Sequence, residues 1–398
     1  MRTVFVSGEK GRLKRSAVPS VFAFKQPHAT RARCRTNRTL LSEAANKVTT
    51  AEVMPDVGAE VVCQADDCTA AASAEMDITS TVSSVSEASV QCDLLRPIDT
   101  RFSVNNFVHN PAVIRYYTGF VDFSHFLLLF QILGPAASNL TYKCTLLEPI
   151  DQLFLTLMKL RQAKDDFELG LLFKISETTV ASVIKTWINF MYYQFKEINI
   201  WPSHSTVQQH MPEGFARMFG NTRVILDATE IPIAKPTDVR AQSCTFSTYK
   251  NRNTLKTMVG CTPRGLTCYV SDSYGGSASD RQLIERSTLY KEADMFDSGD
   301  AIMADRGIMV QDLFANKNVH VNTPKMLKGK SRFEPQEIVK DRRIASKRIH
   351  VERVIGLSKT FKILKRELPA SKRIFGSRII YICFMISNFR NAIVSGWA

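Results

Sequence analysis

The spacing of apolar residues changes along the chain, and this change limits the folds that the chain can adopt. Apolar side chains recur at three- and four-residue intervals in 151–160 and again in 178–190, which is typical of amphipathic helices. From Arg223 onward β-rich segments take over, beginning with RVILDATEIPI at 223–233. The sequence therefore predicts an all-α region followed by a region that contains a sheet.

The region after residue 223 alternates strands and helices. The turn TPRG at 262–265 joins two strands into an antiparallel meander. Ser279 and Gln282 have the spacing of a capping box that begins a helix. Further along, the expected elements are strands at 257–261, 266–271, 301–304 and 319–322 and helices at 280–289, 311–316 and 338–359. This order predicts an α/β fold with a mixed sheet flanked by helices.

Residues 167–190 have the pattern of a helix, a turn and a second helix. Ser176 is expected to cap the second helix, with Thr179 at its third position. In a helix-turn-helix the second helix enters the DNA major groove. Because 177–185 offers a single basic side chain, Lys185, among many apolar ones, a purely structural helical pair fits the pattern equally well.

Charge is arranged in blocks along this chain, whose formal net charge is +14. Residues 1–41 hold ten Lys and Arg and one Glu, whereas 42–93 hold ten acids and one Lys. The acidic block has no aromatic residue and cannot bury enough surface to fold. Residues 323–378 hold 17 Lys and Arg and five acids, which favours a polyanion partner, most simply nucleic acid, over an ordinary solvated face.

These shifts predict four regions. They are a basic arm at 1–41, an acidic low-complexity linker at 42–95, a helical domain at 96–200 and a second folded domain at 220–395.

Several classes of protein are excluded. With 44% hydrophobic residues and 24 Phe, the chain can bury a core. The longest apolar run, 379–386, is too short to span a membrane, and the N-terminus lacks the apolar stretch of a secretion signal. Nine Cys, none spaced C-x-x-C, are therefore expected to be reduced thiols of an intracellular protein.

Three carboxylates occupy positions suited to a metal site. Asp227 is expected at the end of the first strand, Asp305 at the end of strand 301–304, and Glu352 within the long helix. The face of the helix that carries Glu352 also carries Arg348, Gly356 and Lys359. Acids placed in this way can converge, and three carboxylates suit Mg²⁺ or Mn²⁺ better than zinc. Any one of these acids alone is better explained as a capping or ion-paired residue.

Five motifs around these acids resemble those of DDE superfamily endonucleases. They are LDATEIPIAKPTD, YKNRNTLKTMVGCTPRG, VSDSYGGSASDRQLIERS, IMADRG and IASKRIHVERVIG, in that order. The resemblance covers residue 141 to about residue 391, and it is to the branch of transposase-derived proteins joined to THAP zinc fingers. It implies an RNase H-like catalytic domain, preceded by an all-α helix-turn-helix region.

The resemblance also implies roles for individual residues. Asp227, Asp305 and Glu352 correspond to an acidic triad that holds two divalent ions, Mg²⁺ or Mn²⁺. One ion would activate a water that attacks a phosphodiester, and the other would stabilise the leaving 3′-oxygen. Asp280 is implied as an accessory acid, although a helix-capping charge explains it equally. The residues expected to contact DNA are Lys250, Lys256, Arg306, Arg348 and Lys359, of which the first two are equally explained as exposed strand lysines.

A second resemblance lies near the N-terminus. Residues 13–22, LKRSAVPSVF, resemble the closing motif of a THAP finger, whose zinc is held by three Cys and one His lying mostly upstream. Residues 1–12 contain neither Cys nor His, so no zinc site is expected. We interpret 1–41 as a truncated THAP remnant that acts as a basic, nuclear-targeting arm, which places the protein in the nucleus.

Two hypotheses about function remain at this point. The first is a transposase-type, metal-dependent endonuclease that cuts double-stranded DNA. The second is a domesticated DNA-binding or protein-interaction factor that keeps the fold without the reaction. The complete set of acids favours the first, whereas the absent finger and the unusual RGIMVQ after Asp305 favour the second. No membrane partner is expected, and a homodimer or a separate DNA-targeting protein is left open.

Overall fold

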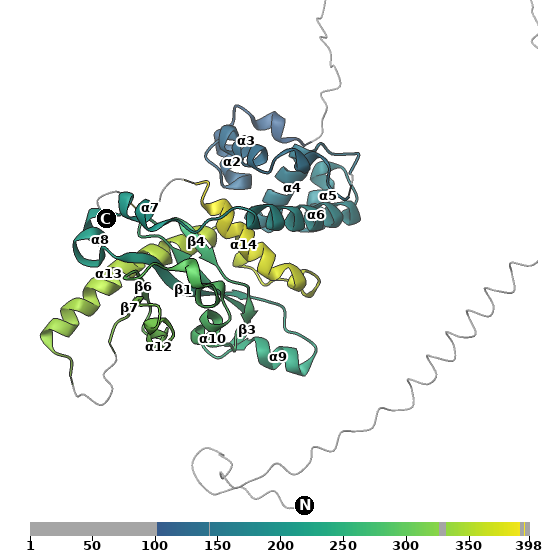
Figure 1. Cartoon of the computed structure of the whole chain (residues 1–398). Coiled ribbons are helices and arrows are strands. Elements are labelled where there is room, and N and C mark those ends of the chain that lie inside the picture. Colours follow the sequence, from purple (N-terminus) through teal and green to yellow (C-terminus); the bar gives the residue numbers. More distant parts are fainter. Residues whose placement is uncertain (1–101, 143, 326–331, 391–393, 395–398) are drawn as a thin grey trace, which may run out of the picture. The chain divides into compact units, whose positions relative to one another are not determined.

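A computed structural model describes residues 102–142, 144–325, 332–390 and 394 (Figure 1). The expected basic arm at 1–41, with its THAP remnant, and the expected acidic linker at 42–95 lie outside these residues. No helix in the described part of the chain is long and apolar enough to cross a bilayer.

The described part begins with an all-α region, as predicted from the helical spacing. Its main helices are α2 (Pro111–Thr118), α3 (Phe123–Ile132), α4 (Pro149–Gln162), α5 (Asp166–Phe173) and α6 (Glu177–Lys196). Short 3₁₀ turns lie at Val104–Phe107 (η1) and Pro135–Ser138 (η2).

The predicted helix-turn-helix is formed by α5 and α6. The Ser176 hydroxyl accepts a hydrogen bond from the Thr179 N–H, which caps α6 as expected. The apolar face of α6 packs against α4, which is buried along most of its length. Trp187 is fully buried there, and its indole N–H donates to Gln152 Oε1 at 3.1 Å. This packing fixes the orientation of α6.

A mixed sheet follows. Its strands are β1 (Thr222–Pro232), β2 (Phe246–Ser247), β3 (Arg252–Cys261), β4 (Thr267–Val270), β5 (Tyr274–Gly275), β6 (Ala301–Ala304) and β7 (His320–Asn322). The order is β2-β3-β1-β6-β7, with β4 and β5 also paired to β3. β1, β3 and β4 form the predicted antiparallel meander, whereas β6 runs parallel to β1 and β7 parallel to β6.

Helices cover both faces of the sheet, and the alternation along β1 shows why. Ile225 and Ile231 enter the core that includes residues of α13 (Pro335–Ser358) and α14 (Gly376–Ser387). Val224 and Leu226 point to the opposite face and enter a second core. Residues of the second core come from α10 (Asp280–Glu285), α11 (Thr288–Lys291) and α12 (Gln311–Ala315). This α/β architecture, a mixed sheet between helices and preceded by an all-α region, is consistent with an RNase H-like fold.

The remaining short helices and 3₁₀ turns lie in the segments that precede, connect or follow the strands. They are α7 (His204–Gln209), α8 (Glu213–Phe219), α9 (Val239–Thr245) and 3₁₀ turns at Ala293–Met295 (η3), Lys362–Leu364 (η4) and Ala370–Phe375 (η5).

Two details differ from the sequence prediction. Asp227 does not end the first strand, because β1 pairs with β3 from Ile225 to Pro232 and so continues past it. The helix expected at 280–289 is divided into α10 and α11. At the break the Ser287 hydroxyl donates to the Ile284 carbonyl oxygen, a local bond that competes with the regular helical pattern. The capping box of Ser279 and Gln282 at the start of α10 is confirmed.

The contact between β1 and β3 predicts a packing effect at Gly260, which pairs with Leu226. A Cβ at Gly260 would lie 2.8 Å from Val224 Cγ2 and 3.0 Å from Leu226 Cδ2. We expect Gly260→Ala to lower the free energy of unfolding by about 1–3 kcal/mol through overpacking. Urea unfolding measures this. Gly356→Ala is the matched control, because a Cβ in that helix meets no atom within 4 Å and should stabilise by up to ~1 kcal/mol. Equal effects of the two substitutions would contradict this account of the sheet.

Candidate active site

The register of the parallel strands brings two of the predicted acids together. Leu226 on β1 pairs with Ala304 on β6, so Asp227 and Asp305 are the next residues on neighbouring strands. The Asp227 carboxylate accepts a hydrogen bond from the Ala228 N–H, and the Asp305 carboxylate accepts one from the Arg306 N–H. Both carboxylates are therefore held at one edge of the sheet.

Asp227 lies in an unfavourable place for a negative charge. Its side chain is half-buried, and burial raises its pKa from 3.8 to about 6. The nearby charge of Arg348 opposes this rise in the pKa, whereas the charges of Asp305 and Glu352 add to it. The charges of both acids therefore act on Asp227, although the three carboxylates are not among the groups of the described residues whose ligand atoms lie within 4.8 Å of one another.

Arg348 supplies positive charge to this group. Its Nη1 lies 2.8 Å from Asp305 Oδ1, and its charge also lowers the pKa of Asp227. Arg348 Nε is buried and has no hydrogen-bond partner among the described residues. The predicted DNA contact Arg348 is thus engaged with a predicted catalytic acid.

The face of α13 explains how Glu352 and the cations reach the site. Arg348, Glu352 and Lys359 follow one another at intervals of four and seven residues, while Val351 and Ile355 point into the core. The pKa of Lys359 is lowered by burial and by Lys250, although Asp227 and Glu230 act in the opposite direction.

His350, two residues before Glu352, belongs to the core instead. It is buried, and its Nδ1 lies 2.8 Å from the Pro263 carbonyl oxygen.

The predicted accessory acid lies beside the same edge of the sheet. A Cβ at Gly307, in the turn after Asp305, would lie 3.8 Å from Asp280 Oδ2. Lys256 Nζ lies 3.3 Å from Asp280 Oδ1 and 3.5 Å from Glu230 Oε1. Lys256 therefore holds two carboxylates. Glu230 was missed from the sequence, and its spacing gave no signal, because two residues three positions apart on a strand point to opposite faces.

The other predicted DNA contacts surround this edge. Arg306 is exposed in the turn after β6, and Lys359 is half-buried at the end of α13. Lys250 lies in the turn between β2 and β3, not within a strand, and its Nζ is 4.3 Å from the centre of the Tyr249 ring.

A different group of side chains has the tighter geometry of a metal site. Within the described ranges, the ligand atoms of His204, Asp297 and Asp300 all lie within 4.8 Å of one another. Arg223 pairs with both acids there, with its Nη1 at 3.2 Å from Asp297 Oδ2 and 3.4 Å from Asp300 Oδ2, and so compensates part of their charge. Because Arg223 precedes Asp227 by four residues on β1, this group lies ~13 Å from the triad neighbourhood. Sequence reasoning missed it, because His204 at the start of α7 is far in the chain from Asp297 and Asp300 in the loop before β6, and no motif joins them.

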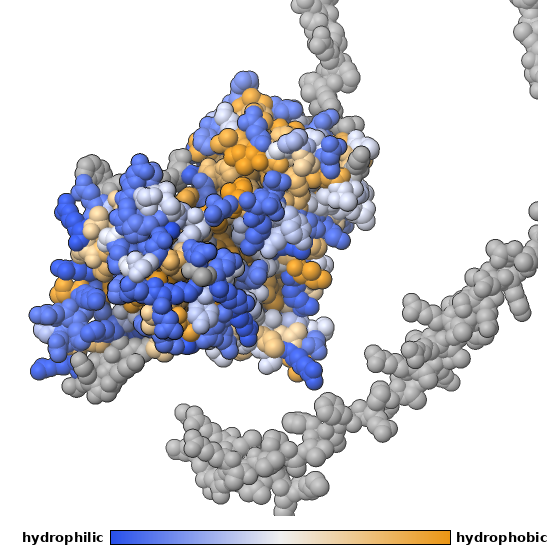
Figure 2. Space-filling view, in the orientation of Figure 1, coloured by the Kyte–Doolittle hydropathy of each residue, from blue (hydrophilic) through white to orange (hydrophobic). Residues whose placement is uncertain are grey.

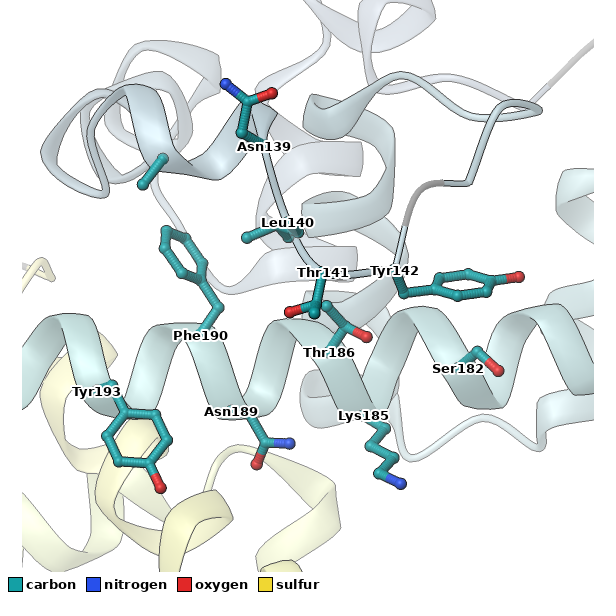
Figure 3. Close-up of a pocket in the computed structure, with 11 residues that line it drawn as sticks. Asn139, Leu140, Thr141, Tyr142, Ser182, Lys185, Thr186, Asn189, Phe190 and Tyr193 are labelled. Carbon is teal, nitrogen blue, oxygen red and sulfur yellow. The ribbon is translucent and has the colours of Figure 1, made fainter.

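The outward face of α6 forms a second candidate surface (Figure 3). It carries Ser182, Lys185 and Asn189 at intervals of three and four residues. A pocket of about 570 Å³ lies between this face and the segment 139–142. The Ser182 hydroxyl and the Lys185 ammonium group have the chemistry that binds base edges and phosphates. Asn189 Oδ1 instead accepts a hydrogen bond from Arg378 of α14 (Gly376–Ser387).

The fold is a mixed α/β domain that carries the three predicted acids on β1, directly after β6 and on α13. Residues 226–388, which include Asp227, Asp305 and Glu352, match the family model of the DDE superfamily endonuclease. Residues 144–197, which include α4 to α6, match the helix-turn-helix of DDE superfamily endonuclease. No curated protein matches the chain. The chain therefore contains a DDE superfamily endonuclease domain preceded by its helix-turn-helix region, and both suggest DNA as a partner.

The raised pKa of Asp227 predicts a pH effect on the metal-free protein. Between about pH 4 and pH 6 the folded chain binds more protons at Asp227 than the unfolded chain, so its contribution to stability is lost as pH rises through this range. Asp227→Asn should remove this slope and stabilise the protein above pH 6, by at most about 3 kcal/mol. Urea unfolding in EDTA across pH 4–8 measures the difference, with the exposed Asp297→Asn as control. Parallel curves for wild type and Asp227→Asn would contradict the assignment.

Proposed function

We propose that this protein is a transposase-type endonuclease that cuts DNA at Asp227, Asp305 and Glu352 with two divalent cations. The observation that carries the proposal is the shared neighbourhood of three acids at one sheet edge, within the region that matches the endonuclease family. Mg²⁺ and Mn²⁺ are the cations that such all-oxygen sites prefer.

The residues present fit such cations. The Asp227 carboxylate is half-buried and is repelled by two other carboxylates, so an added positive charge would relieve an unfavourable arrangement. Asp227, Asp305 and Glu352 would hold the cations. When bound, two cations supply an activated water and stabilisation of the leaving oxygen.

The chain's own residues would position the DNA. Lys359, Lys250 and the exposed Arg306 surround the acids and can hold phosphates on either side of the bond to be cut. Lys256, paired with Asp280 and Glu230, is better placed to orient Asp280 than to hold DNA in this arrangement.

A catalytically silent DNA-binding factor is the second candidate. The observation that favours it is the contact of 2.8 Å between Arg348 and Asp305, because an internal cation already compensates part of the acidic charge. The same fold and DNA partner would then remain without the reaction.

Finer features of the proposal rest on the sequence alone. We infer membership of the THAP-associated branch from the motif at 13–22 and a nuclear location from the basic arm at 1–41. The regions 96–200 and 220–395 are proposed as the helical and catalytic domains. A homodimer and a separate DNA-targeting protein are retained as proposals.

Cleavage and metal binding separate the two candidates. We expect wild type to nick supercoiled plasmid in Mn²⁺ or Mg²⁺, and millimolar metal to raise its melting temperature. Asp227→Asn and Glu352→Gln should lose both effects, because an amide holds a hard cation poorly. Asp297→Asn, in the other acidic group, is the matched control and should keep both. If metal stabilisation depends on Asp297 instead and no nicking occurs, the metal site is the group that contains Asp297. The catalytically silent DNA-binding factor is then the better description.

The outward face of α6 should contribute to DNA binding. We expect Lys185→Ala to weaken binding of duplex DNA and to reduce the slope of log affinity against log salt by about 1 if Lys185 contacts a phosphate. Lys291→Ala removes the same charge from α11 and should leave the affinity and the slope unchanged. Fluorescence anisotropy at several salt concentrations measures both. Equal losses in the two variants would indicate only a general charge effect.

A further inference from the structure

An open pocket of about 580 Å³ lies along α13. It borders the group formed by Asp227, Asp305 and Glu352, which we call the acid cluster. One wall belongs to the helix and includes Ile338, Ala345 and Arg348, which follow one stripe of α13 that leads to Glu352. The other wall includes Asp305 and Phe333. Because Asp305 and Arg348 belong both to this pocket and to the acid cluster, the two spaces are continuous.

The wall on the far side of the pocket is held against α13 by specific bonds. The Lys325 N–H lies 3.1 Å from Asp341 Oδ1 and 3.2 Å from Asp341 Oδ2. Lys325 Nζ lies 2.8 Å from Glu337 Oε1. These contacts bind the end of the segment after β7 to the helix and so fix the position of Pro324, which also lines the pocket.

The lining combines two chemistries. Arg306, Arg342 and Arg348 supply cationic groups. Two carboxylates also line the pocket, and both already have partners: Asp305 is paired with Arg348, and Asp341 accepts from the Lys325 N–H. Phe333 and Ile338 supply apolar surface, and the Ile338 side chain leaves 38% of its residue surface exposed. Figure 2 shows that the outer part of α13 is otherwise largely hydrophilic in this view. A purely ionic DNA groove gains nothing from an exposed isoleucine beside a half-buried phenylalanine, so the apolar wall suggests a ligand with an apolar face.

One nucleotide has both properties. Its phosphate pairs with arginine, and the face of its base stacks on aromatic and apolar side chains. In a paired duplex that face is covered by neighbouring bases, so only a base removed from the stack can use the wall. The volume lies within the ~300–1,000 Å³ range of pockets that bury small ligands. Ala345 is seven residues from Glu352 along α13, about 10 Å, which places such a base within a few nucleotides of the acids.

We propose that this pocket holds an unstacked nucleotide next to the phosphodiester at the acid cluster. Arg306 and Arg342 contact its phosphates, and its base lies against Phe333 and Ile338. This inference rests on the proposed endonuclease function, because it names the part of the DNA substrate that occupies the space beside the same acids.

The test uses the full chain in EDTA and two duplexes of one sequence. One duplex is fully paired, and the other carries a single unpaired 2-aminopurine. Fluorescence anisotropy gives the affinities, and 2-aminopurine fluorescence reports stacking of the base. We expect wild type to bind the duplex with the unpaired base roughly tenfold more tightly, which is the effect of stacking one base on an aromatic side chain. We also expect the fluorescence of that base to be quenched.

Two substitutions at neighbouring positions give a matched comparison. Ala345→Phe fills the pocket and should abolish both the preference and the quenching while keeping the affinity for paired DNA. Ser346→Phe adds the same ring outside the pocket, on an exposed position, and should keep the preference. Thermal melting verifies that each variant is folded, and Ile338→Ser removes the apolar wall without added bulk if Ala345→Phe does not fold.

The outcomes separate this pocket from the proposed function. Equal affinity of wild type for both duplexes, or a preference that survives both Ala345→Phe and Ile338→Ser, overturns the pocket. A change of oligomeric state in Ala345→Phe with unchanged DNA preference also overturns it and assigns the wall to a second copy of the chain. Nicking is measured in parallel in Mn²⁺. A preference for the unpaired base without nicking supports the pocket and contradicts the proposed endonuclease function. Nicking without that preference supports the endonuclease function and contradicts the pocket.

Discussion

The parallel pairing of β1 with β6 is the contact on which the candidate site depends. It places Asp227 and Asp305 on adjacent strands at the same edge of the sheet, in partly buried surroundings where negative charge is costly. Burial is the main cause of the rise in the pKa of Asp227 to about 6, and the charges of Asp305 and Glu352 add to it. An arrangement of this kind is stable only because the rest of the domain holds the strands together and supplies compensating positive charge.

One helix supplies most of that compensation. α13 carries Glu352 and, four residues earlier, Arg348, whose Nη1 lies 2.8 Å from Asp305. The same helix therefore brings the third acid and the cation that partly neutralises the first two. Under the proposed function this pairing has a further consequence. Divalent metal ions bound to Asp305 would weaken its attraction for Arg348. The Arg348 guanidinium would then be available to a DNA phosphate beside it.

Much of the fold was predictable, because its signals are local. The strand at 301–304 and the cap at Ser176 follow from apolar runs and capping patterns that the structure retains. The position of Asp227 within β1 was predicted wrongly, because the length of a strand is set by pairing with β3 and not by its own residues. Local sequence suggested that acids at such positions could converge, but it did not reveal which cations accompany them. The pairing of Arg348 with Asp305 and of Lys256 with Glu230 joins residues far apart in the chain.

The structure also connects the helix-turn-helix to the region that matches the endonuclease family through side chains of α14. α6 lies beside α14 (Figure 1), and the Tyr381 hydroxyl donates to the Phe195 carbonyl oxygen at 3.3 Å. Arg378 donates to Asn189 Oδ1 and, at 3.1 Å, to the Tyr193 hydroxyl. Because α14 also packs against α13 and β4, the polar face of α6 is coupled to the acids through packed helices and not through a linker. Under the proposed function, DNA bound by α6 would be held at a set position relative to Asp227, so that recognition by one region would determine which phosphodiester reaches the other.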